Sequence, residues 1–513
     1  MQCATVIGWG MQKERLNVDE MFTLEGSKQG GYGQRYWDHS EDFFGREHTG
    51  REFRDWLTTF PEELLIRQDA SEIVSTLFKR DIYYVLINLA TTACPGVLTH
   101  WIGAGLNMFF FIVSQILLFC LARKLEGNSC ALLTVAVYGF SAGAISTVLY
   151  IRCYMMLAMM LLATIMLYIK LDEAKKNSQR IMIFIGLYLL LIVGYEVHSF
   201  SIILFGITTV FFLIYFIVKK HIKSLIWFIG GYGIPAVLGW EIVYARIGGT
   251  LGGTTGQIFF GILRGSGIRE LIYRGYLLMT IVAGHLLTGK AMVFIAICGF
   301  LSLFIFLGVK KKNAFKVSAI VKGNILEILI ILIPIVYSMV LVIGSAIAWK
   351  YISPVYPLFV LSLTLLWYKA ARMIKARELA TLLFAGALAI VTVVSYCRVQ
   401  ISELFIGQEA LREEINEKYH DWNGIMVHHG LSENWLYEAA TLWPEDSHVL
   451  LVKNEVLHDR ELCYNRPDEK ILLWLTIDYD NDEVIEELKE CTDYKDVELA
   501  FTTDSLLVYE CTK

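Results

Sequence analysis

The sequence predicts a mainly α-helical polytopic membrane protein, with about ten or eleven spans and a small C-terminal α/β domain outside the bilayer. Of its 513 residues, 55% are hydrophobic and only 19% are charged, whereas soluble domains carry about 25% charged residues. The charge is also uneven. Long apolar stretches fill residues 100–398, and charged side chains gather in residues 12–81 and after Glu403. A soluble protein would instead show short apolar runs separated by polar faces.

Apolar runs of about 18 residues or more are long enough to cross the hydrocarbon core as helices, and tilt accommodates spans of unequal length. The predicted spans are 100–122, 130–149, 151–170, 181–196, 199–218, 224–245, 291–309, 325–347, 353–368 and 378–398. Residues 271–287 are also apolar, and we expect a re-entrant or interfacial segment there. Met1–Trp9 is too short to cross. We expect it to be the end of a longer first helix, with an interfacial helix as the alternative.

Every second connection between the spans is basic, which marks the cytoplasmic side. These connections carry Arg123, Lys124, Lys170, Lys175, Lys176, Arg180, Lys219, Lys220, Lys223, Lys310, Lys311, Lys312, Lys316, Lys322, Lys369, Arg372, Lys375 and Arg377. The polar N-terminal region and the C-terminal domain are then both expected outside. We therefore predict three parts: residues 1–99 as a truncated first helix and an outer loop with amphipathic helices, 100–398 as the membrane domain, and 399–513 as an extracytoplasmic domain.

The C-terminal part alternates strand-like and helix-like runs, which is typical of a small α/β domain. We expect strands at Gly424–His428, His448–Val452, Lys470–Ile477 and Val497–Thr502, and helices at Glu433–Leu442 and Asp482–Cys491. From Glu403 onward there are 27 acidic and 9 basic residues. This acidic end offers no basic face for nucleic acid.

Four short patches carry candidate functional residues, and the predicted topology places all of them outside. Asp19-Glu20 is a carboxylate pair suited to proton abstraction, or an ordinary acidic pair in a polar loop. Arg152 with Tyr154 opens a span and suits a phosphate at headgroup depth, although arginines also snorkel there. His198 ends another span as a titratable group or a hydrogen-bonded interfacial histidine. Lys350-Tyr351 offers a second cation, or a flanking lysine in an aromatic belt.

In their order and sidedness these patches resemble the C-type (GT-C) integral-membrane glycosyltransferases. The nearest branch is that of the protein mannosyltransferases and lipid A aminoarabinose transferases, families 39 and 83. The resemblance covers roughly residues 15–370. It places Asp19 on the catalytic aspartate, with Glu20 as its companion, and Tyr83-Tyr84 on the second half of an "HPPLYYLLLH" segment. Later motifs of the family are matched by Arg152, Tyr154, His198, Lys350 and Tyr351. Lys79-Arg80-Asp81 replaces the family's His-Pro-Pro, and Lys350 replaces an arginine, which keeps the charge but loses the bidentate fork.

The resemblance implies an inverting enzyme that takes a sugar from a polyprenyl-phosphate donor on the outer face of a bacterial plasma membrane. Asp19 would be the general base toward an envelope acceptor. Arg152, Lys350 and Tyr154 would bind the donor phosphate, and Tyr83, Tyr84, His198 and Tyr351 would contact substrate. No metal site is predicted, although a divalent cation beside Asp19 and Glu20 is compatible with the pattern.

Two other classes stay open. A transporter or flippase for a lipid-linked or anionic solute would use similar charges. Such proteins often carry repeats and a site at mid-membrane, whereas the candidate charges here gather at one interface. An inactive relative that scaffolds other envelope enzymes through residues 400–513 is the third interpretation.

Overall fold

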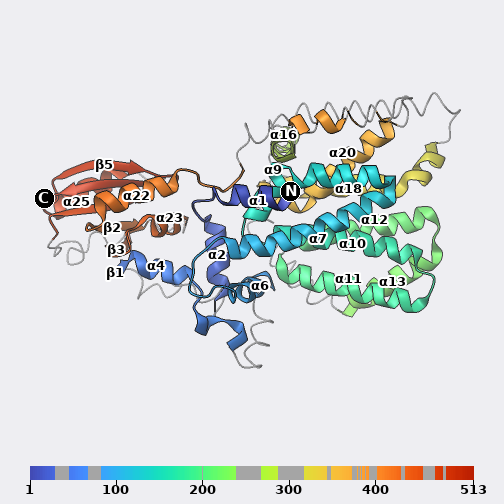
Figure 1. Cartoon of the computed structure of the whole chain (residues 1–513), viewed down its shortest axis with the longest axis horizontal. Helices are drawn as coiled ribbons and strands as arrows, with labels where there is room; N and C mark the ends of the chain where they lie inside the picture. The colour runs from blue at the N-terminus through green and yellow to red at the C-terminus, as the bar shows by residue number, and fades with distance from the viewer. Residues whose placement is uncertain are drawn as a thin grey trace. The chain divides into compact units, whose positions relative to one another are not determined.

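The computed structural model describes the following residues, together with short runs between 378 and 391: 1–28, 45–67, 82–198, 200–238, 267–286, 317–343, 348–371, 401–428, 434–453, 468–477 and 481–513. These residues form two compact units (Figure 1). The helical unit comprises Met1–Trp9 and Ala104–Ser402, and the mixed unit comprises Gly10–Gly103 and Glu403–Lys513.

Six helical segments in the described ranges are long and apolar enough to cross a membrane. They are α7 (Trp101–Glu126), α10 (Tyr154–Glu173), α11 (Asn177–Val197), α12 (Ser201–Lys219), α18 (Val317–Ile343), and the segment from Trp349 to Ala371 formed by α19 (Trp349–Ile352), η6 (Ser353–Val355) and α20 (Tyr356–Ala371). The bent pair α8 (Asn128–Gly139) and α9 (Ala142–Leu149) would be a seventh. The polytopic helical architecture is therefore confirmed. Some of the expected spans lie outside the described residues: all of 291–309, most of 378–398 and the end of 224–245.

Three further helices complete the helical unit as described: α1 (Gln2–Gly10), α13 (Ile222–Leu238) and α16 (Gly267–Leu286). Helix α16 occupies the segment expected to be re-entrant or interfacial, and it packs against α9 and α18. Helix α18 is irregular at Asn324 and carries Pro334 in its interior. The kink in α18 lies at Asn324, whose backbone is not helical, and Pro334 removes one helical hydrogen bond further along the helix.

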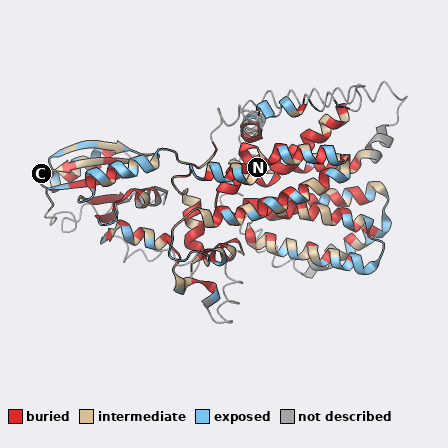
Figure 2. Cartoon of the chain, viewed as in Figure 1, coloured by how far each residue is buried: buried red, intermediate tan, exposed pale blue. Residues whose placement is uncertain are grey.

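Burial varies strongly among the spans, as Figure 2 shows. The apolar window of α10 is 72% buried and that of Trp349–Ala371 is 83% buried, whereas that of α11 is 28% buried. Helix α11 exposes Ile181, Ile185, Leu189 and Ile192. In water such a row would be costly, but it suits a helix face turned to lipid. Helix α10 and the Trp349–Ala371 segment therefore form the centre of the helical unit.

The break between α8 and α9 is built by local hydrogen bonds. The two helices are bent by 57°. Ser141 caps α9 because its hydroxyl accepts a hydrogen bond from the Ala144 amide at 3.2 Å. Serine is a favoured N-cap because it satisfies an amide that has no partner within the helix. The short α9 that results carries the chain into the turn before α10.

The mixed unit is built on a six-stranded sheet of order β1-β3-β2-β4-β6-β5. Its strands are β1 (Glu47–Thr49), β2 (Asn423–His428), β3 (His448–Lys453), β4 (Lys470–Thr476), β5 (Asp496–Thr502) and β6 (Leu506–Thr512). The pairs β2–β3 and β2–β4 are parallel, and the outer pairs are antiparallel. The other elements are α2 (Val18–Ser27), α4 (Gly50–Leu57), η3 (Pro61–Glu63), η4 (Leu65–Arg67), α6 (Ile82–Thr91), α22 (Gln408–Tyr419), α23 (Asn434–Leu442) and α25 (Asn481–Cys491).

Alternating side chains on the central strands enter two separate cores. Met426 on β2 packs into a cluster with Met21 of α2 and Phe53 of α4. Its neighbours Ile425 and Val427 join a second cluster, which includes Val484 of α25. Successive residues of a strand point to opposite faces of the sheet, so a strand covered on both faces is apolar throughout. This explains the continuous apolar run of β2.

The four strands and two helices expected in the C-terminal part are confirmed, with each end correct to within one residue, and the small α/β domain is confirmed with them. Two strands and one helix, namely β1, β6 and α22, were not predicted. Strand β1 pairs antiparallel with β3 from Glu47↔Leu450 to Thr49↔His448. Residues expected to form an N-terminal part therefore share a sheet and a core with the C-terminal residues.

Candidate functional site

Arg152 lies in the turn between α9 and α10, and the backbone of this turn is held tightly. The Tyr150 amide closes α9 on the Ser146 carbonyl at 3.0 Å, and the Arg152 amide donates to the Tyr150 carbonyl at 2.7 Å. The buried amide of Asn107 on α7 donates to the same Tyr150 carbonyl at 2.7 Å and to the Val148 carbonyl at 3.3 Å. Carbonyls at a helix end need such partners. Asn107 therefore orients the turn that presents Arg152.

Tyr154, the first residue of α10, is the centre of an aromatic cluster. Its ring stacks on Tyr150 at 6.1 Å between centroids. It also contacts His198 at 5.5 Å and, edge-on, Tyr351 at 6.0 Å. His198 and Tyr351 are 6.2 Å apart. Three patches from distant parts of the sequence, at Arg152-Tyr154, His198 and Lys350-Tyr351, thus come together in the helical unit.

The backbone around Lys350 is fixed from two directions. The Tyr337 hydroxyl on α18 donates to the Tyr351 carbonyl at 3.0 Å, and the Ser353 hydroxyl donates to the Lys350 carbonyl at 2.9 Å. The Lys350 ammonium lies 5.5 Å from the centre of the Tyr351 ring, a cation–π distance. Lys350 is half-buried, and so is Arg152, which precedes Tyr154 of the cluster by two residues.

His198 caps the C-terminal end of α11, and one of its ring nitrogens has a defined role. The Phe200 amide donates to Nδ1 at 3.1 Å. A nitrogen that accepts a hydrogen bond carries no proton, so the neutral ring bears its proton on Nε2. Nε2 is then a hydrogen-bond donor, which suits a hydroxyl or phosphate oxygen.

Asp19 and Glu20 begin helix α2 in the mixed unit, and they have different environments. Glu20 is fully buried. One of its carboxylate oxygens accepts from the Lys13 ammonium at 2.6 Å and the other from the Asn17 amide at 2.6 Å. The Asn17 side chain accepts in turn from the Asp19 amide at 2.9 Å, completing a capping box. Asp19 itself is half-buried in the first turn, where the helix dipole favours a negative charge.

Tyr83 and Tyr84 lie on α6, which packs against α2. Gly26 of α2 allows this approach, because a Cβ atom there would lie 3.0 Å from the Tyr84 ring. Buried Asn88 ties the helices together by donating to the Ser27 carbonyl at 2.8 Å and accepting from the Leu65 amide at 2.9 Å. Both tyrosines are buried, so their packing supports the helix that carries Asp19. Lys79-Arg80-Asp81 lie outside the described residues.

Sequence reasoning missed three residues beside the aromatic cluster. They are Asn107, Trp349, whose ring lies 5.2 Å from Tyr150, and His285, which stacks on Trp349 at 5.2 Å. The signal for Asn107 was present, because a buried polar residue inside an apolar span usually has a defined partner. In the ranges described, no group of three His, Cys, Asp or Glu side chains could hold a metal ion.

No protein-family model and no curated protein matches the sequence. Among solved structures, the chain is similar to ArnT from Cupriavidus metallidurans bound to undecaprenyl phosphate, with a TM-score of 0.50 and 11% identity over 99% of this chain and 97% of that chain. It is also similar to ArnT from the same organism in the apo state, with a TM-score of 0.51 and 10% identity over 99% and 96% of the two chains. The chain therefore has the fold of ArnT, and the GT-C fold expected from the sequence motifs is confirmed.

Proposed function

We propose that the protein is a membrane glycosyltransferase that moves a sugar from a polyprenyl-phosphate donor to an acceptor of the cell envelope. The observation that carries this proposal is the cluster of Arg152, Tyr154, His198 and Lys350-Tyr351 at the ends of helices in a unit with the ArnT fold. The ArnT structure that binds undecaprenyl phosphate supports a lipid of this class as the donor carrier.

Arg152 and Lys350 are proposed to bind the donor phosphate. Guanidinium and ammonium groups form strong, charge-assisted hydrogen bonds with phosphate. When the bond between the anomeric carbon and the phosphate oxygen breaks, negative charge grows on the departing lipid phosphate, and two fixed cations would stabilise it. Tyr154 and Tyr351 would form the apolar wall beside the phosphate, and Nε2 of His198 would donate to an oxygen of the donor.

Asp19 is proposed as the general base. It takes the proton of the acceptor hydroxyl while that oxygen attacks the anomeric carbon from the face opposite the phosphate, so the configuration inverts. Glu20 is proposed to position Asp19 by fixing the start of helix α2, because both of its carboxylate oxygens accept hydrogen bonds, one from Lys13 and one from the Asn17 amide. We further propose that the reaction takes place on the outer face of the membrane.

Transfer of radiolabel from a synthetic polyprenyl-phosphate sugar, followed in membranes that contain the full-length protein, tests this function. The Asp19→Asn variant should transfer label about 100-fold more slowly or worse, because a general base contributes roughly 10²–10⁴-fold. Asp55→Asn is the matched control, since Asp55 is an exposed aspartate of the same unit. Transfer at the normal rate by Asp19→Asn would refute the mechanism. Movement of labelled lipid across the bilayer without transfer would favour a flippase instead.

A further inference from the structure

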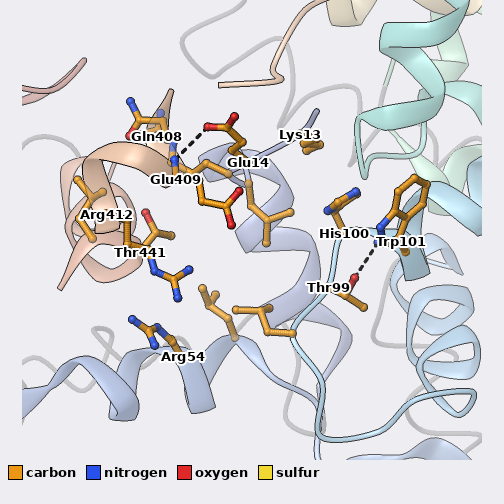
Figure 3. A pocket seen from close by; sticks show the side chains of 15 residues that line it. Lys13, Glu14, Arg54, Thr99, His100, Trp101, Gln408, Glu409, Arg412 and Thr441 are labelled. Carbon is orange, nitrogen blue, oxygen red and sulfur yellow. Dashed lines mark hydrogen bonds between the residues drawn. The ribbon is translucent and has the colours of Figure 1, made fainter. Parts of the chain in front are cut away.

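The mixed unit contains an open pocket of about 290 Å³ that the proposed reaction does not use. Figure 3 shows this pocket, with Arg54 of helix α4 and Arg412 of helix α22 on its wall. The stretch from Thr99 to Trp101 and the end of helix α23 complete the lining. All of these elements belong to the mixed unit, so the pocket is formed within one compact body.

The two arginines make the pocket positive. Arg54 is half-buried, and it donates to the Trp443 carbonyl at 3.0 Å and pairs with Glu445. Burial first, and then the nearby charge of Arg412, lowers the pKa of the Arg54 guanidinium, which nevertheless stays protonated. No carboxylate in the described part of the chain forms an ion pair with Arg412. Two guanidinium groups that repel each other in this way would be stabilised by an anion.

The acidic residues of the lining do not cancel this charge. The Glu14 carboxylate accepts hydrogen bonds from the Gly407 amide at 2.7 Å and the Glu409 amide at 3.0 Å, so it caps the start of α22. Arg15 is likewise bound to Glu438 and Asp504. Glu409 is exposed. Arg412 therefore keeps its donors available to a ligand.

Two buried polar atoms of the pocket lining also lack a hydrogen-bond partner among the residues that the structure describes. Within the described residues, Nε2 of His100 and Oε1 of Gln408 are buried and form no hydrogen bond. Such groups usually bind a protein group, a water molecule or a ligand. Part of the wall is apolar, because Leu16, Leu57 and the Trp101 ring also line the pocket. The pocket thus combines a cationic end with a surface suited to carbon.

We propose that this pocket binds the phosphate group of a phosphate ester, with the Arg412 fork and a remaining donor of Arg54 on the phosphate and the carbon skeleton against the leucines and Trp101. Arginine suits phosphate because its planar donors match two phosphate oxygens at once. The ester comes from a soluble metabolite or from a lipid headgroup, which share this chemistry. The binding site goes beyond the proposed glycosyl transfer and does not depend on it.

Isothermal titration of the full-length protein in an uncharged detergent tests the proposal, with glycerol 1-phosphate and inorganic phosphate as probes. Glycerol 1-phosphate should bind saturably and more tightly than inorganic phosphate. Arg412→Gln should weaken its binding about tenfold or more, the effect of losing a charged hydrogen-bond pair. Arg412→Lys should bind with intermediate affinity, because it keeps the charge but loses the fork.

The matched control is Lys418→Gln, which removes one positive charge from the same helix, outside the pocket. It should bind as the unchanged protein does. Absence of saturable binding below about 10 mM, or equal weakening by Lys418→Gln and Arg412→Gln, would overturn the proposal. Competition by phosphatidic acid in nanodiscs would support it with a lipid headgroup as the source, and binding of the soluble ester without such competition would support it with a soluble one. The titration contains no sugar donor, so its result does not depend on whether the protein transfers sugar.

Discussion

Glu20 and Lys13 form a buried ion pair whose disruption separates a structural role of Glu20 from a catalytic one. Both side chains are almost completely enclosed, at 0% and 1% exposure, with 2.6 Å between Oε1 and Nζ. Glu20→Gln keeps the shape and the hydrogen bond from the Asn17 amide, but it leaves the Lys13 ammonium without its carboxylate. Stranding one partner of a buried pair costs about 3–5 kcal/mol. We expect helix α2 to be destabilised by about 3 kcal/mol.

Hydrogen exchange of peptides from α2, followed by mass spectrometry on the full-length protein in detergent, measures this effect locally. A loss of about 3 kcal/mol corresponds to roughly 150-fold faster exchange where opening is at equilibrium. The double variant Lys13→Met with Glu20→Gln should recover most of the protection, because no buried charge is then stranded. Glu62→Gln, at an exposed position of the same unit, is the control. Exchange within about threefold of normal in Glu20→Gln, or no recovery in the double variant, would refute this reasoning.

Two further predictions concern the turn of the helical unit and the pocket of the mixed unit. Asn107→Leu leaves the carbonyls of Val148 and Tyr150 without their donor, at a cost of about 1–3 kcal/mol, so the Arg152 turn should shift and binding of a polyprenyl phosphate should weaken about tenfold. Fluorescence titration checks this, and Ser114→Ala on the same helix should bind normally. Burial, and then the charge of Lys13, lowers the pKa of His100 to about 4, from 6.5 in the unfolded chain. The unfolded state therefore takes up a proton first, so stability present above pH 6.5 should be lost as the pH falls toward 4. Thermal unfolding across this range should show a smaller loss in His100→Gln, and an unchanged loss would contradict the assignment.

The membrane spans and the strands of the C-terminal part were predictable because their signals are local. Hydropathy over about 20 residues identifies a span, and the apolar run of Lys470–Thr476 identifies a buried strand. Strand β1 was not predictable in this way, since Glu47–Thr49 is three residues long and its partner β3 lies hundreds of residues later. No pattern within a short window of sequence encodes such a pairing. Strand β6 was also not predicted, although its apolar residues could be recognised in the sequence.

In the candidate site, too, the residues could be predicted from local sequence but their contacts could not. Arg152, Tyr154, His198 and Tyr351 could be picked out one by one because they stand at the ends of apolar runs, but their ring contacts depend on how the helices pack. The role of Glu20 could have been found. Asn17 followed three residues later by glutamate is a capping-box pattern, and it indicates a helix start before it indicates chemistry. The pairing of Glu20 with Lys13 and the facing arginines of the pocket required the three-dimensional arrangement.

The pairing of β1 with β3 has a consequence for the order in which the protein is made. A ribosome adding about 5–20 residues per second needs roughly 20–80 s to go from Thr49 to His448. During that interval Met21 and Phe53 lack the strands against which they pack, and the helix that carries Asp19 is without its core. The nascent N-terminal region is therefore open to aggregation and proteolysis until strands β2 and β3 have been made. A variant that lacks the strands of the C-terminal part should leave this N-terminal region unfolded as well.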